Sequence, residues 1–290
     1  MGVYVVNINP ILLAIALFGT VVGTYTDLKT KLVPDWSNYF LLVAGLGGNA
    51  ILSLTHNSFL PILFSAIGAG TFFGLGYLLY VSGIWGGGDA KLLAAFGAIF
   101  GPTPAVAAWP FLASLWLNIL LFGAIFGVIG VIWLLAKNWC KVVPAIKKEF
   151  KKNELMMYPL IGIVAVAIIL YSWKTVFGVI AILAALTFVL FVFKATEEVC
   201  MVKTIKPSML VEGDWIAEAI KIDGFSYEPK RRGVSKEEIT KLIGLEEAGK
   251  LKEIRIKDGL PYVPAFLAAL LVTIFYGDIF YNLIVHLLGL

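Results

Sequence analysis

The sequence predicts an all-α polytopic membrane protein of about six to eight transmembrane helices, with a small cytosolic α+β insert before the last helix. Of its 290 residues, 60% are hydrophobic and only 14% are charged, and the mean hydropathy is +0.90. Average soluble chains carry about 25% charged residues. Several apolar runs also reach or approach the roughly 20 residues that a bilayer-spanning helix requires. A soluble globular protein is therefore excluded.

Apolar segments predict where the membrane helices lie. The expected spans run near Val3–Tyr25, Trp36–Leu54, Phe59–Gly83, Ala90–Phe100, Ala108–Ala136 and Pro261–Leu288. A further block at 159–193 is too long for one helix, and its polar break at Tyr171–Lys174 favours a hairpin of two short helices over one tilted helix. Eight helices is the central count.

Lysines orient the predicted bundle. Lys29 and Lys31 follow the first span and a lysine-rich stretch follows the fifth, whereas the second and fourth loops carry no Lys or Arg. Cytoplasmic loops collect Lys and Arg, so we expect the N-terminus outside and the odd-numbered loops inside. The protein is then a multi-pass protein of the cell membrane that contacts the lipid bilayer. The positive net charge of +4 reflects these loops, and no nucleic-acid partner is expected.

The charged segments divide the chain into five parts. We expect a transmembrane bundle at 1–136, a basic cytosolic loop at 137–158, an additional transmembrane hairpin at 159–193, a cytosolic soluble insert at 194–259 and a C-terminal transmembrane helix at 260–290. In the insert, Ser235-Lys236-Glu237-Glu238 has the form of a capping box that opens a helix running to about Leu251, and Met209–Tyr227 is strand-like. The basic loop is expected to face lipid, and interfacial anchors are expected at Trp36, Trp85, Trp139 and Trp173.

Two aspartates at the predicted cytosolic face are the leading functional candidates, because ionisable residues at the membrane boundary are costly. Asp27 ends the first span and Asp89 begins the fourth, so the two can meet. Two carboxylates in a low-dielectric site do not both ionise readily, so one can act as base and the other as acid. That division suits peptide hydrolysis by water. No Ser–His, Cys–His or metal set competes, and neither a cofactor nor a metal is expected.

Glycines precede the second aspartate, in Gly86-Gly87-Gly88-Asp89-Ala90-Lys91-Leu92. Glycine lets backbone approach closely, so this run can make room for an extended peptide beside the acid. The segment resembles the Gly-x-Gly-Asp helix start of the GxGD aspartyl proteases, and among them the type IV prepilin and archaeal preflagellin peptidases. Asp27 with Val33-Pro34-Asp35 resembles the first-aspartate segment of that family, and Pro261-Tyr262-Val263-Pro264 is similar to its late Pro-x-x-Pro element.

The resemblance implies that Asp27 and Asp89 are the catalytic pair of an aspartyl endopeptidase in the 1–136 bundle. It implies a substrate that carries a short basic leader before a hydrophobic helix, namely a preflagellin or type IV pilin-like precursor, cut at the cytosolic membrane face. It further implies a set of residues that shape the substrate site: Gly86, Gly88, Lys91, Asp35, Pro261 and Pro264.

Other interpretations stay open at this point. Asp89 could be a helix-start acid stabilised by the macrodipole, Asp27 an interfacial cap, Asp35 a solvated helix-start residue and Lys91 a snorkelling side chain. For the whole chain, the alternatives are a presenilin-like or signal-peptide-peptidase-like intramembrane protease and, less favoured, a proton-coupled transporter. The protease alternative places both acids deeper in the membrane, and the transporter predicts acids near mid-membrane on broken helices.

Overall fold

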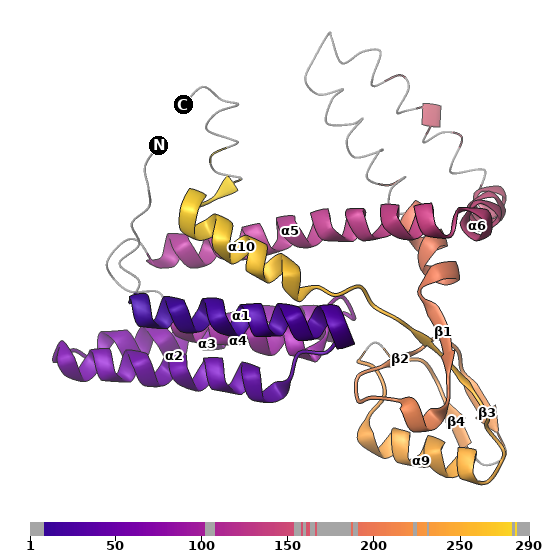
Figure 1. Ribbon diagram of the computed structural model, residues 1–290, viewed down its shortest axis with the longest axis horizontal. Helices are drawn as coiled ribbons and strands as arrows, with labels where there is room; N and C mark the ends of the chain where they lie inside the picture. Colours follow the sequence, from indigo (N-terminus) through magenta and orange to yellow (C-terminus); the bar gives the residue numbers. More distant parts are fainter. Residues whose placement is uncertain are drawn as a thin grey trace.

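The computed structural model describes residues 9–101, 108–153, 191–222, 225–230 and 232–279, with isolated positions between 158 and 187 and at 282. The membrane part contains six described helices up to residue 153 and a later helix near the C-terminus (Figure 1). Their bounds are α1 Pro10–Thr30, α2 Asp35–Thr55, α3 Leu60–Val81, α4 Gly87–Phe100, α5 Ala108–Lys137, α6 Trp139–Lys152 and α10 Val263–Tyr276. The expected hairpin at 159–193 lies almost wholly outside the described residues.

Four of these helices are long and apolar enough to cross a bilayer: α1, α2, α3 and, within α5, Phe111–Lys137. Large apolar side chains such as Leu54 and Phe275 remain exposed on the outer surfaces, where lipid rather than water is the favourable neighbour. The prediction of a polytopic membrane protein is confirmed. One boundary differs from expectation, because α1 continues to Thr30 and Asp27 therefore lies within the helix, one turn before its end.

The short helix α4 occupies the centre of the bundle, and all but its first three residues and Lys91 are buried. It packs chiefly against α3 and α2. The closest approach is at Gly97 and Gly68, where a Cβ on Gly97 would lie 2.1 Å from the carbonyl oxygen of Gly68. Small residues at such crossings let membrane helices pack backbone to backbone. In Figure 1, α10 lies between α5 and α1, and it contacts both helices.

The segment between the membrane helices and α10 folds as a small α+β unit, as expected. Its strands are β1 Val202–Ile205, β2 Trp215–Ile216, β3 Ile220–Ile222, β4 Phe225–Tyr227 and β5 Ile254–Lys257, with a 3-10 turn at Pro207–Met209 and a helix α9 at Lys236–Glu247. β5 lies between β1 and β2, antiparallel to both, and β3 pairs with β4. A hydrophobic core of its own, including Leu242, Ile254 and Ile256, holds α9 to the sheet.

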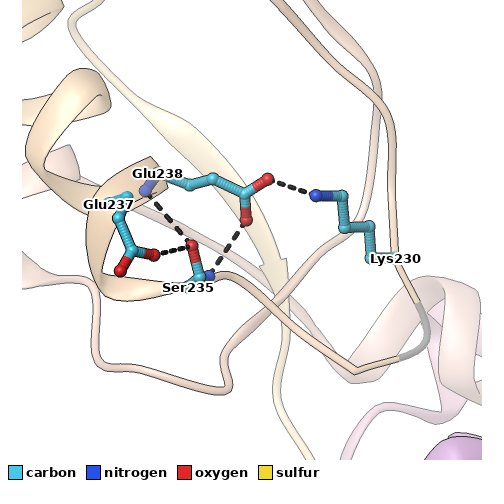
Figure 2. Close-up of polar contacts among 4 residues, drawn as sticks. All are labelled: Lys230, Ser235, Glu237 and Glu238. Atoms are coloured by element: carbon cyan, nitrogen blue, oxygen red, sulfur yellow. Dashed lines mark hydrogen bonds and ion pairs between the residues drawn. The ribbon is translucent and has the colours of Figure 1, made fainter.

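A full capping box begins α9, as the sequence predicts (Figure 2). The Ser235 hydroxyl accepts the backbone N–H of Glu238, and the Glu238 carboxylate accepts the N–H of Ser235 at 3.0 Å. Glu238 also forms an ion pair with Lys230. Partial burial is the largest single influence on the pKa of the Glu238 carboxyl, and it acts to raise that pKa. The contacts with Lys230 and Ser235 together outweigh it, so the pKa of Glu238 lies below its usual value. The helix ends at Glu247, earlier than the expected Leu251, because Gly249 takes a positive φ of 70°.

The basic segment after α5 was expected to be a loop, and this detail was wrong. Residues 139–152 form the helix α6, although Pro144 lies inside it. Apolar side chains recur at a spacing of four residues, at Val142, Ile146 and Phe150, and this spacing places them on one helix face. Val142 is fully buried, so tertiary packing on that face supports a helix that the lysine content obscured.

Candidate functional site

Asp27 and Asp89 come from different helices and lie at the same end of the bundle. Asp27 is in the last two turns of α1 and is buried, with a relative exposure of 5%. Asp89 is in the first turn of α4. Their carboxylates are close enough for the two charges to interact. The topology argument therefore places the acids correctly: the end of the first span and the start of the fourth meet.

Asp27 binds the start of the last helix. Its Oδ2 accepts the backbone N–H of Val263 at 2.8 Å, across 236 residues of sequence. Val263 is the first residue of α10 and Pro264 the second. Proline has no N–H to satisfy and suits this position, so Asp27 serves as an N-cap supplied by another helix. The partial positive charge of a helix N-terminus favours a carboxylate there.

Asp89 binds its own helix start. Its Oδ2 accepts the N–H of Gly86 at 3.0 Å, which is the backbone half of a capping box. Each aspartate thus caps a helix start with one oxygen, Asp27 that of α10 and Asp89 that of α4. Tyr262, the residue before α10, is a second backbone partner of Asp27.

Gly88 allows α4 to begin close to the chain that follows α1. A Cβ at Gly88 would lie 3.1 Å from Cβ of Val33, and the Asn38 side chain donates to the Gly88 carbonyl at 3.1 Å. Gly86 is different: it takes an extended conformation at the N-cap, and a Cβ there would meet only Asp89 Oδ2, at 3.4 Å. A side chain at Gly88 would therefore require Val33 to shift by a few tenths of an ångström, whereas one at Gly86 would not.

Lys91 and Asp35 form an ion pair at the rim of the site. Lys91 Nζ lies 2.6 Å from Asp35 Oδ1 and 5.4 Å from the Tyr39 ring centroid. Since Asp35 is the first residue of α2, this pair joins the first turns of α2 and α4. Lys91 thus holds the helix that carries Asp89 in place. The contacts made by Lys91 are with α2, and none of those described is with the two aspartates.

Two aromatic residues complete the site, and sequence reasoning missed them. Trp85 was expected as an interfacial anchor, which is wrong: only 3% of it is exposed. Its ring packs against Tyr262, with centroids 5.2 Å apart. The Tyr262 hydroxyl donates to the carbonyl of Ile119 at 3.3 Å and fits against Gly123, where a Cβ would lie 1.9 Å from it. Their place in the sequence could have indicated a role at the site, because each aromatic residue is next to a motif residue: Trp85 precedes Gly86 and Tyr262 follows Pro261.

The other residues singled out from the sequence are the two prolines near α10 and the tryptophans expected at the membrane interface. Pro264 is buried in the first turn of α10, while Pro261 precedes that helix and is only half-buried. Trp36 and Trp139 are exposed, as interfacial anchors would be, and Trp173 lies outside the described residues. Among the residues that the structure describes, no group of three or more His, Cys, Asp or Glu side chains could hold a metal ion.

Comparison with known proteins gives the site a family context. Residues 12–135, which include both aspartates, Asp35, Gly86, Gly88 and Lys91, match the model of the type IV leader peptidase family. This part of the chain is therefore similar to that family. The match includes α2, α3 and α4 and most of α1 and α5. It stops well before α10, so the backbone N–H that Val263 donates to Asp27 comes from outside the matched region.

Individual relatives agree with the family. The chain is 32% identical over 153 residues to a preflagellin peptidase of Methanococcus voltae, covering 50% of this chain and 64% of that protein. It is 26% identical over 152 residues to a preflagellin peptidase of Methanocaldococcus jannaschii, covering 50% and 63%. A prepilin peptidase EppA of Methanothermobacter thermautotrophicus is 28% identical over 100 residues, covering 34% and 26%. The matched regions thus span less than two thirds of each relative.

Proposed function

We propose that this protein is a membrane-embedded aspartyl endopeptidase that removes the basic leader of preflagellin-like or prepilin-like precursors. One observation carries the proposal: two aspartates from separate helices, both within the region that matches the leader peptidase family, lie together at one end of the bundle. The names of the relatives indicate the substrate class.

The division of labour follows from the different partners of the two acids. Asp27 faces the N-terminus of α10 and accepts the Val263 N–H, and both features stabilise a negative carboxylate. Asp89 has a single N–H donor from its own N-cap and lies beside the charge of Asp27. Two neighbouring negative charges are unfavourable. Asp27 is therefore the base and Asp89 the protonated acid.

Hydrolysis by this pair needs no cofactor. A water molecule between the carboxyls gives a proton to Asp27 and attacks the scissile carbonyl carbon, while Asp89 gives its proton to the carbonyl oxygen. When the tetrahedral intermediate collapses, Asp27 passes its proton to the leaving amine and Asp89 recovers one from the hydroxyl. The peptide bond is broken, and both acids return to their starting protonation states.

The position of the acids favours cleavage at a membrane face over cleavage within a transmembrane helix. Asp27 lies one turn from the end of α1 and Asp89 in the first turn of α4, so both are near a bundle end. Lys29, Lys31 and the lysine-rich α6 lie at helix ends on this side, as does the insert, which is bound through the 2.7 Å ion pair between Lys31 and Asp258 (Figure 1). The positive-inside rule makes this end cytosolic.

The test uses isosteric variants of the full chain reconstituted in liposomes. Asp27→Asn and Asp89→Asn should each abolish cleavage of a precursor that carries a short basic leader before a hydrophobic helix. The amide that replaces the Asp27 carboxylate keeps an oxygen for the Val263 N–H, so the fold should survive. Asp214→Asn, on the insert, is the matched control and should cleave normally. Products are read by gel mobility and mass spectrometry.

Two outcomes would contradict the proposal in different ways. Cleavage retained by either active-site Asn variant would remove the paired-aspartate mechanism. Equal cleavage of a plain transmembrane helix without a leader would leave the chemistry intact and favour the presenilin-like alternative. Proton-driven uptake into the same liposomes without any cleavage would instead support the transporter.

A further inference from the structure

The helix α6 has one apolar face and one basic face. Val142, Ile146 and Phe150 share the apolar face; Val142 is fully buried, and the Phe150 ring packs 6.5 Å from that of Phe191, centroid to centroid. The other side is exposed to the surroundings and carries five lysines: Lys141, Lys147, Lys148, Lys151 and Lys152. We call these five side chains the basic face of α6.

The direction of α6 differs from that of the membrane spans. In Figure 1, α5 lies lengthwise in the view and α6, at its end, is seen end-on, so α6 runs across the direction of α5 and does not continue it. Since α5 has the length and composition of a membrane span, α6 runs along the plane of the bilayer where that span leaves it. The surroundings fit an interface: Trp139 is 62% exposed, and Lys137 Nζ lies 4.8 Å from the Trp133 ring centroid.

The charge of the basic face has no counterpart in the described part of the chain. Glu149 is the one acid in α6, and its carboxylate lies 3.6 Å from Lys194, outside the helix. None of the ion pairs among the described residues involves the five lysines. A row of exposed cations in the plane of the membrane is complementary to a surface of anions at the same height.

We propose that α6 is an interfacial helix whose basic face binds the headgroups of anionic phospholipids. Its geometry matches an amphipathic helix that lies in the interface, with lysines on the polar side. Each lysine near an anionic leaflet raises the equilibrium constant for binding of the helix to the membrane surface by about fivefold. A basic leader peptide would be repelled by this surface, so the lipid surface is the occupant that the charges select.

The experiment measures hydrogen–deuterium exchange of peptides within 139–152 in the full chain, held in nanodiscs. The discs contain phosphatidylcholine alone or phosphatidylcholine with added phosphatidylglycerol. Exchange should slow by about tenfold or more in the anionic discs. This factor is smaller than the product of the gains of about fivefold that the five lysines would each contribute. Replacing Lys147, Lys148, Lys151 and Lys152 together by Gln should remove that difference, and replacing the same four by Arg should preserve it.

A matched variant distinguishes a local surface from general attraction. Lys206, Lys221, Lys241 and Lys252 are exposed on the insert, and changing all four to Gln removes the same charge. The difference between discs should persist in this variant. The proposal is overturned if the wild-type chain exchanges equally in both discs, or if the insert variant loses the difference as fully as the α6 variant. It is also overturned if inorganic phosphate, at matched ionic strength in phosphatidylcholine discs, gives the same protection, because the site would then bind a soluble anion.

Discussion

Replacing Gly97 by Ala tests how strongly the close contact of α3 and α4 holds the site. A Cβ at this position would lie 2.1 Å from the Gly68 oxygen, 2.5 Å from the Gly68 carbonyl carbon and 2.9 Å from Ala69 N. Real contacts of this kind are not shorter than 3.0 Å. All three neighbours are backbone atoms that no rotamer change can move, so the two helices must separate by about 1 Å. Overpacking of this size costs about 1–3 kcal/mol.

The effect should reach the end of the bundle that holds the two aspartates, because α4 carries both Gly97 and Asp89. We expect Gly97→Ala to lower the thermal unfolding temperature in detergent, followed by tryptophan fluorescence, and to reduce cleavage of a leader-bearing precursor. The matched control is Gly74→Ala on α3, where a Cβ would meet no atom within 4 Å and the helix gains about 0.5–1 kcal/mol of propensity. If Gly97→Ala unfolds at the same temperature as Gly74→Ala, the close packing does not hold these helices together.

Three further predictions concern other parts of the fold. Asn118 is buried and donates to Thr273 Oγ1 at 2.9 Å, so Asn118→Leu should lower the unfolding temperature, with a loss of about 0.6–1.7 kcal/mol, while Asn118→Gln should lose less. Ser235→Ala removes the side-chain cap of α9 and should destabilise the insert by about 1 kcal/mol. The loss should appear as faster hydrogen exchange in α9. Unchanged exchange would show that the Glu238 half of the capping box is enough to hold the start of this helix. Burial raises the pKa of the Asp214 carboxyl, so the folded insert binds a proton before the unfolded chain does, and its stability should rise as pH falls from neutral towards that pKa. Asp214→Asn should flatten this pH dependence in thermal unfolding.

Much of the membrane part could be predicted from sequence because its signals are local. Long apolar runs specify α1, α2, α3 and α5, since a bilayer admits few other backbone arrangements. The meeting of Asp27 with Asp89 followed from lysine distribution and from counting helices. The helix α6 was missed because its signal is the spacing of three apolar residues among many lysines, and its stability depends on tertiary packing.

Contacts between distant segments were beyond such reasoning. β1 and β5 pair across about fifty residues, and neither strand was expected, since a four-residue strand has no distinctive pattern of its own. The bond between Asp27 and Val263 is equally non-local. Nothing at Asp27 indicates that its partner is a backbone N–H, and the motif around Pro264 suggested a helix start without showing which side chain would cap it.

The Asp27–Val263 bond has a consequence for biosynthesis. Asp27 and its donor Val263 are separated by 236 positions, so a ribosome must reach the start of α10 before the carboxylate can accept this N–H. Until α10 inserts beside α1, Asp27 lacks the hydrogen bond from the Val263 N–H. Under the proposed function, the pair of aspartates therefore reaches its final arrangement only after α10 has been made and inserted.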